Sequence, residues 1–111
     1  MNREGRIGMN EAVFRDVNER IQDVAQAFDL SSEPLDLICE CGDAGCVDRI
    51  SLTRDEYEQM RADARLFAVA PGHEAPDVEE VVEKRGGYDI VRKNEGTPAA
   101  IAESTDPRSG S

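Results

Sequence analysis

The stretch CECGDAGC, residues 39–46, contains all three cysteines of the chain. The single histidine follows later, in the stretch PGH at residues 71–73. Structural zinc sites commonly take four ligands in tetrahedral geometry, drawn from cysteine thiolates and histidine imidazoles. Three cysteines and one histidine complete such a set. We therefore predict one structural zinc ion, Zn2+, bound by Cys39, Cys41, Cys46 and His73.

The sequence on either side of the cysteines predicts a β-hairpin with the cysteine cluster at its tip. Residues 35–40 alternate between apolar and polar side chains, which is typical of a strand. The stretch GDAG, residues 42–45, favours a turn, and VDRISL, residues 47–52, favours the returning strand. Residues two apart in a strand share a face, so Cys39 and Cys41 can face one ion. Backbone amides of the turn are expected to stabilise thiolate charge.

Residues 11–28 predict a long helix, because their apolar side chains recur at spacings of three and four. The apolar face expected from this spacing consists of Val13, Phe14, Val17, Ile21, Val24, Ala25 and Phe28. Charged side chains such as Arg15 are expected on the outside. Asn10 suits the N-cap position, with Met9 and Phe14 at the positions of a hydrophobic staple.

A second, shorter helix is predicted over residues 54–64. Thr53 and Glu56 have the spacing of a capping box at its start. Residues 66–70 then favour a short extended segment, which ends in a Pro-Gly turn. That turn is expected to deliver His73 to the cysteines.

Residues 78–93 fit two kinds of structure. Their valines suit a helix behind Pro76, and they equally suit a strand. We prefer a hairpin around the Gly-Gly turn, because Tyr88, Ile90 and Val91 continue as strand-forming residues.

The predicted organisation is a single domain with unstructured ends. Residues 1–9 form a polar leader that we expect to be disordered, and translation can start at Met1 or at Met9. Residues 95–111 are rich in small and polar side chains and predict a flexible tail. Residues 10–94 are expected to form a small zinc-stabilised α+β domain. In it, one long N-terminal helix and a short second helix pack on β-hairpins.

Composition limits the classes of partner. The chain has 111 residues, of which 24 are acidic and 13 basic, giving a net charge of -11. Such a chain repels phosphate backbones and its basic residues are scattered, so we expect no nucleic acid partner. The N-terminus lacks the apolar region of a secretory signal, and no apolar run approaches a membrane span. We therefore expect a cytoplasmic protein without membrane contacts, whose thiols stay reduced and available to a metal.

The cysteine cluster also fits other chemistry. The cysteines could be buried small apolar side chains, or ligands of an iron–sulfur cluster, for which four thiolates are usual. A zinc hydrolase would use Glu40 or Glu74 as its base, and Cys41 with His73 could form a nucleophile–base pair. A redox sensor would use Cys46 as the resolving thiol. We prefer a non-enzymatic regulatory or adaptor protein that binds a partner protein with a basic surface, itself a monomer or weak homodimer.

Five stretches together resemble a family of small uncharacterised bacterial proteins. They are NEAVFRDVNERI (10–21), CECGDAGC (39–46), RISLTRDEYEQMR (49–61), FAVAPGHE (67–74) and VVEKRGGYDIVRK (81–93). The resemblance covers most of the chain between residues 10 and 93. It implies that the Cys-Glu-Cys-Gly run and the Pro-Gly-His turn belong to one recurring site.

Overall fold

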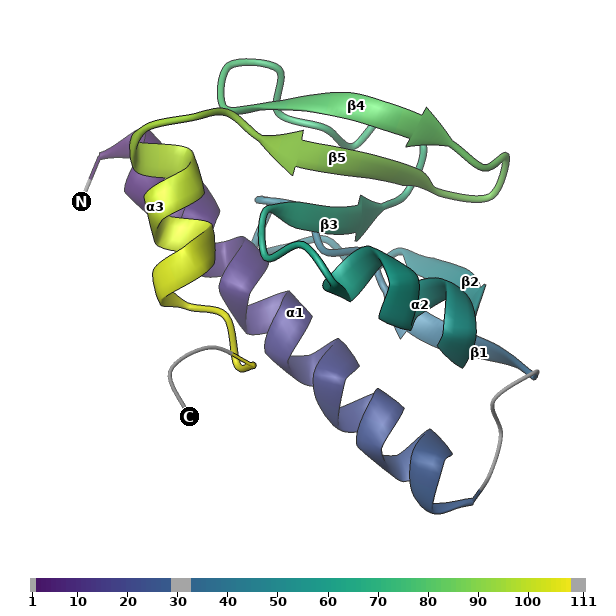
Figure 1. Ribbon diagram of the computed structural model, residues 1–111. Coiled ribbons are helices and arrows are strands. Elements are labelled where there is room, and N and C mark those ends of the chain that lie inside the picture. Colours follow the sequence, from purple (N-terminus) through teal and green to yellow (C-terminus); the bar gives the residue numbers. More distant parts are fainter. Residues whose placement is uncertain (1, 29–32, 109–111) are drawn as a thin grey trace.

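The computed structural model describes residues 2–28 and 33–108. In chain order, the elements within these ranges are α1 (Arg3–Ala27), β1 (Pro34–Ile38), β2 (Arg49–Thr53), α2 (Arg54–Arg61), β3 (Leu66–Val69), β4 (Glu79–Lys84), β5 (Asp89–Lys93) and α3 (Thr97–Ser104). β1 and β2 form one antiparallel sheet, and β3, β5 and β4 form a second in that order. Figure 1 shows α1 running beneath the three-stranded sheet, with α3 against its N-terminal half. This arrangement confirms the predicted α+β class.

Both predicted hairpins are present. β1 pairs with β2 from Pro34 opposite Thr53 to Ile38 opposite Arg49, so the cysteine cluster lies in the connecting loop. β4 pairs with β5 across the Gly-Gly turn, where Gly86 has φ of +85°. A positive φ suits glycine because it has no Cβ. The helical alternative for residues 78–93 is therefore wrong.

The second helix begins where it was predicted to begin, but it ends at Arg61, three residues earlier than predicted. Thr53 Oγ1 accepts a hydrogen bond from the Glu56 amide at 3.1 Å, and Glu56 Oε1 accepts one from the Thr53 amide at 2.8 Å. This reciprocal pair is a capping box. The helix then turns Tyr57 and Met60 into the core that α2 shares with both sheets.

The helix predicted over residues 11–28 exists, but most of the predicted packing face is wrong: of the seven predicted residues only Ala25 is buried, and Ile21 is partly buried against the core. Val13, Val24 and Phe28 are exposed, whereas polar side chains face the core. Arg15 is fully buried and donates hydrogen bonds to the backbone oxygens of Ala64 at 2.7 Å and Ala102 at 2.8 Å. The polar face is buried because distant segments supply such partners, which offset the cost of removing polar groups from water.

The predicted disordered leader is also wrong where it is described, because α1 begins at Arg3. Asn2 is the N-cap, and its Oδ1 accepts a hydrogen bond from the Gly5 amide at 2.8 Å. Asn10, the predicted cap, lies inside the helix and no staple forms at that point. Two glycines in this stretch conceal the helical pattern. Gly8 is explained by close packing, because a Cβ on it would lie 2.7 Å from Ile101 Cγ2. Met1 lies outside the described residues.

The predicted flexible tail contains a third helix, α3, that packs against α1. Its small residues Ala99 and Ala102 are buried. Beyond it, Arg108 pairs with Glu19 Oε2 at 2.6 Å and with Glu58 Oε1 at 2.8 Å. The prediction failed because small side chains allow close helix packing without raising the local hydropathy. Residues 109–111, which also belong to the predicted tail, lie outside the described residues.

A buried ionic cluster joins α1 to the three-stranded sheet. Lys93 Nζ lies 2.6 Å from Glu11 Oε1 and 3.0 Å from Glu79 Oε1, and all three side chains are buried. Burial, with the nearby Glu79 carboxylate, raises the pKa of Glu11 to about 9, while Lys93 acts in the opposite direction. None of the helices in the described ranges combines the length and apolar content needed to cross a bilayer.

Candidate metal centre

Four potential metal ligands meet between the first hairpin and the turn after β3. Cys39, Cys41 and Cys46 come from the hairpin loop, and His73 comes from the Pro-Gly turn. Their ligand atoms all lie within 4.8 Å of one another. His73 Nδ1 lies 3.5 Å from Cys39 Sγ and 3.6 Å from Cys46 Sγ. The structure thus brings the four sequence-predicted residues together in a group that could hold a metal ion.

The two nitrogens of His73 have different neighbours. Nδ1 faces the sulfurs, while Nε2 lies 3.1 Å from Asp48 Oδ2. A neutral imidazole that binds a metal through one nitrogen carries its proton on the other, and a carboxylate commonly accepts that proton's hydrogen bond. Asp48 is placed to do so and thereby to orient the ring. Sequence reasoning missed Asp48, although a residue two positions after the last cysteine is expected to lie close to the metal ligands.

Backbone amides point at the buried thiols. The Ala70 amide donates to Cys39 Sγ at 3.1 Å, and the Asp43 amide donates to the Cys41 thiol. Asp43 belongs to the predicted turn, whereas Ala70 at the end of β3 was not foreseen. Burial raises the pKa of the Cys39 and Cys41 thiols, and these amides oppose the rise. A bound cation would oppose it more strongly, because a coordinated thiol is deprotonated.

The loop that carries the cysteines is held by its own hydrogen bonds. Asp43 accepts from the Gly45 amide through Oδ1 at 2.9 Å and from the Cys46 amide through its backbone oxygen at 3.0 Å. Gly42 packs so closely on α1 that a Cβ there would lie 2.5 Å from Ile7 Cγ2. The Gly42 backbone oxygen also accepts a hydrogen bond from Asn10 Nδ2 at 2.8 Å. The first turns of α1 therefore support the loop.

Glu40, between two of the cysteines, points into the core. Its Oε2 accepts hydrogen bonds from the Tyr57 hydroxyl at 2.5 Å and from Asn18 Nδ2 at 2.8 Å, and its Oε1 accepts one from the Ala68 amide at 3.0 Å. The Glu40 amide also donates to the Ala68 backbone oxygen at 2.9 Å. The strand-like alternation of Cys39, Glu40 and Cys41 thus sends the carboxylate away from the thiols. Glu40 connects the loop to α1, α2 and β3, and does not serve as a base at the metal group.

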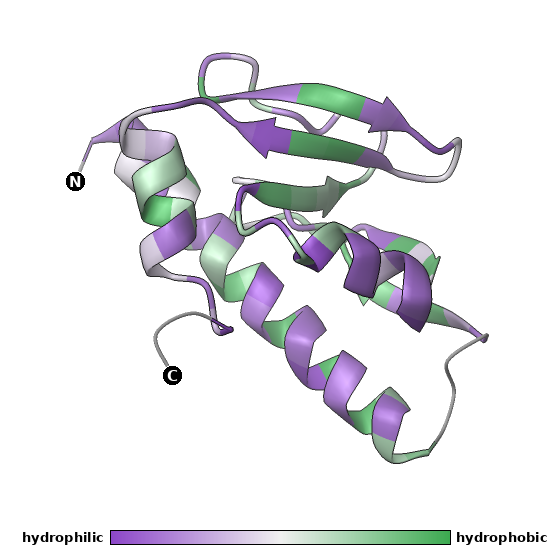
Figure 2. Ribbon diagram, in the orientation of Figure 1, coloured by the Kyte–Doolittle hydropathy of each residue, from purple (hydrophilic) through white to green (hydrophobic). Residues whose placement is uncertain are grey.

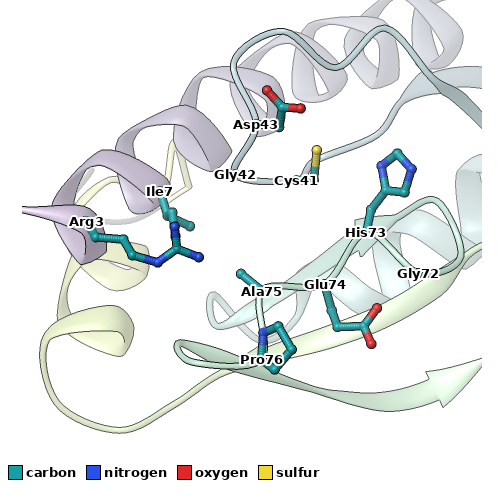
Figure 3. Close-up of a pocket in the computed structure, with 10 residues that line it drawn as sticks. All are labelled: Arg3, Ile7, Cys41, Gly42, Asp43, Gly72, His73, Glu74, Ala75 and Pro76. Carbon is teal, nitrogen blue, oxygen red and sulfur yellow. The ribbon is translucent and has the colours of Figure 1, made fainter.

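A pocket of about 450 Å3 borders the metal group. Cys41 and His73 contribute to its wall, together with Arg3, Gly42 and Glu74. Figure 3 shows the Glu74 carboxylate pointing away from the His73 ring. Arg3 is paired with Asp77 at 2.8 Å. Neither glutamate named for hydrolysis is therefore directed at the four ligands.

Comparisons with protein-family models, curated proteins and solved structures found no match for this chain. The resemblance to a family of small bacterial proteins stays a prediction. Support for a metal site therefore comes from the chain itself: three thiols and one imidazole lie close together, Asp48 contacts the imidazole, and backbone amides donate to the thiols.

Proposed function

We propose that the protein binds one Zn2+ through Cys39 Sγ, Cys41 Sγ, Cys46 Sγ and His73 Nδ1. The support is the distance between the sulfur atoms and the imidazole nitrogen. Zn–S bonds of about 2.3 Å and Zn–N bonds of about 2.0–2.1 Å, separated by a tetrahedral angle, put sulfur and nitrogen about 3.5 Å apart. The two sulfur–Nδ1 distances are 3.5 and 3.6 Å. Zinc also favours a mixed set of thiolates and imidazole.

The proposed role of the ion is structural. Catalytic zinc sites usually keep one position for water, whereas four protein ligands complete a tetrahedral shell. Here the shell would join the hairpin loop to the turn after β3, in addition to the hydrogen bonds that Glu40 and Cys39 make with Ala68 and Ala70. Metal binding to a preformed site adds directly to the free energy of folding. A cytoplasmic location is part of the proposal, because the ligand thiols stay reduced there.

Native mass spectrometry with and without a chelator tests this assignment. Wild-type protein is expected to carry one zinc ion, identified by mass, and to unfold at lower temperature after chelation. His73→Ala should retain much less zinc than Glu74→Ala, the matched change at the neighbouring residue whose side chain points elsewhere. Unchanged zinc content in His73→Ala would contradict the four-ligand site. Iron or no metal in freshly purified protein would contradict zinc.

We further propose that the metal-stabilised domain is a non-enzymatic adaptor that binds a basic surface on another protein. The support is the net charge of -11. Attraction between opposite charges speeds association and weakens as salt rises. Capture experiments at low and high salt should therefore recover partners rich in lysine and arginine that dissociate as salt increases. Turnover of a small substrate, with no such partner recovered, would favour an enzyme over an adaptor.

Redox sensing is a second candidate, favoured by the partial exposure of Cys46 beside two buried cysteines. Because Cys46 is the most exposed of the three cysteines, peroxide would oxidise its thiolate first, forming a sulfenic acid and releasing one hydroxide; this differs from the expectation that Cys46 is the resolving thiol. A second ligand thiolate would then displace a further hydroxide, form a disulfide and release zinc. Zinc release can be followed with a chromogenic chelator during peroxide addition and thiol reduction. Release that thiols do not reverse, or that yields no disulfide involving Cys46 by peptide mass mapping, would reject this function.

A further inference from the structure

The outward side of α1 carries an apolar surface that the fold leaves uncovered. Its members, with their exposed fractions, are Met9 (43%), Val13 (57%), Val17 (39%), Val24 (58%) and Phe28 (72%). We call these five residues the α1 outer face. Spacings of four and seven place them on one side of the helix. Buried polar residues such as Arg15 and Asn18 occupy the other side. Figure 2 shows apolar segments recurring along the C-terminal half of α1, and Figure 1 shows no labelled element on its outward side.

Four of the five members of the α1 outer face are arranged symmetrically along the helix; Val17 is the exception, because its counterpart position holds Arg20. Met9 and Phe28 are equally distant from the point between Asn18 and Glu19, and so are Val13 and Val24. Such an arrangement suits a two-fold contact between identical chains, because residue i of one copy then meets residue j of the other while j meets i, and both are apolar. An antiparallel second copy of α1 would place Met9 against Phe28 and Val13 against Val24. A partner of unrelated sequence would need no such symmetry.

An ion pair at the border of the face, near the middle of its length, favours the same orientation. Asp16 Oδ2 and Arg20 Nη2 form an ion pair at 3.1 Å within one chain, and they lie on either side of the same central point. In an antiparallel pair, each aspartate comes next to the arginine of the other copy. In a parallel pair, aspartate would face aspartate and arginine would face arginine, which is destabilising.

We propose that two copies of this chain associate through antiparallel packing of their α1 outer faces. A helix of 25 residues is about 37 Å long, and the α1 outer face has only five large apolar side chains, so we expect one helix pair to bury less than the roughly 800 Å2 per partner of a standard stable interface. The dimer is therefore weak and depends on concentration. Two chains of net charge -11 also repel each other, so added salt strengthens the dimer. This response is opposite to that of binding to a basic partner, and the dimer does not rest on the proposed adaptor function.

Sedimentation velocity of the zinc-loaded full chain, over a wide range of concentration and at two salt levels, tests the association. Val24→Asp puts a charge in the contact and should weaken the dimer at least about tenfold, equivalent to about 1.4 kcal/mol. The matched control is Val82→Asp on β4, an exposed valine remote from α1 in sequence. Both variants must retain the wild-type zinc content and melting behaviour. A chain that stays monomeric throughout, or a dimer unaffected by Val24→Asp, would overturn the proposal.

A charge exchange tests the orientation. The double variant Asp16→Arg with Arg20→Asp keeps the antiparallel match within its own dimers. It creates like-charge contacts only when mixed with wild-type chains. Native mass spectrometry of the variant mixed with isotope-labelled wild type should therefore show each chain pairing with itself several-fold more than with the other. Preferential mixed dimers indicate parallel helices, and random mixing indicates a contact away from this centre; either result rejects the antiparallel arrangement.

Discussion

His73 lies between the thiols and Asp48, with Nδ1 facing the sulfurs and Nε2 3.1 Å from Asp48 Oδ2. The contact gives Asp48 a role that its exposed position would not suggest. Replacing Asp48 by alanine should weaken zinc binding about 10- to 100-fold, because the ring loses the group that orients it and supports its basicity. Competition with a chromogenic chelator measures the affinity. Asp36→Ala is the matched control, because Asp36 pairs with Arg49 on the same hairpin but away from the ligands. Equal affinity in both variants would remove Asp48 from the site.

The two glycines of the cysteine loop should respond differently to alanine. At Gly42, a Cβ would lie 2.5 Å from Ile7 Cγ2, so the loop or α1 must move. At Gly45, the nearest atom is Asp43 Oδ1 at 3.5 Å, which is ordinary contact. Gly42→Ala should lower the free energy of unfolding by about 1–3 kcal/mol and weaken zinc retention, while Gly45→Ala should be tolerated. Denaturant titration with zinc analysis measures both effects. Equal stability of the two variants would contradict the packing of the loop on α1.

The Tyr57 hydroxyl is expected to contribute to stability through Glu40. Tyr57→Phe leaves the buried carboxylate without its 2.5 Å donor, which should cost about 1–3 kcal/mol of unfolding free energy. Zinc content should not change, because Glu40 points away from the thiols. Tyr88→Phe, at the only other tyrosine, removes a hydroxyl that does not contact Glu40 and is the control. Chemical denaturation of both variants provides the comparison, and a loss of zinc in Tyr57→Phe would place Glu40 closer to the metal than its contacts indicate.

The contribution of Glu11 to the stability of the metal-free chain should fall as pH rises above about 4.5. The pKa of this carboxyl is raised from 4.5 to about 9 in the folded chain, first by burial and then by Glu79. Between these two values the folded state holds a proton that the unfolded state releases, so the contribution is complete below 4.5 and is lost as pH approaches 9. One such group changes the unfolding free energy by at most about 1.4 kcal/mol per pH unit. Glu11→Gln should flatten this dependence, measured by denaturation at a series of pH values. A slope identical to that of the wild type would show that Glu11 titrates normally.

The parts of the fold that sequence predicted are those determined by neighbours along the chain. The capping box of Thr53 and Glu56 and the Gly-Gly turn each specify a local conformation. The meeting of the cysteine loop with His73 was also predicted, because zinc chemistry calls for a fourth ligand and the chain holds one histidine.

The parts that sequence missed depend on contacts between distant segments. Glu11 faces the core because Lys93 is there, and Arg15 does so because the Ala64 and Ala102 carbonyls are there. Hydrophobic periodicity cannot anticipate such partners and therefore selected a face of α1 that is mostly exposed. The same limitation concealed α3. Its small residues indicate a buried helix only once the close packing of Gly8 in α1 against Ile101 in α3 is known.

The backbone hydrogen bond from Glu40 to Ala68 has a consequence for the protein without its metal. β3 is an outer strand of the three-stranded sheet, and the cysteine loop lies along its free side. The loop thus acts as a cover for a strand whose sequence is LFAV. If chelation released the loop, this apolar strand would present unpaired amides and carbonyls to other chains, as exposed edges that seed aggregation do. Metal loss would then reduce solubility as well as stability, and the ion would protect the chain against self-templated β-assembly.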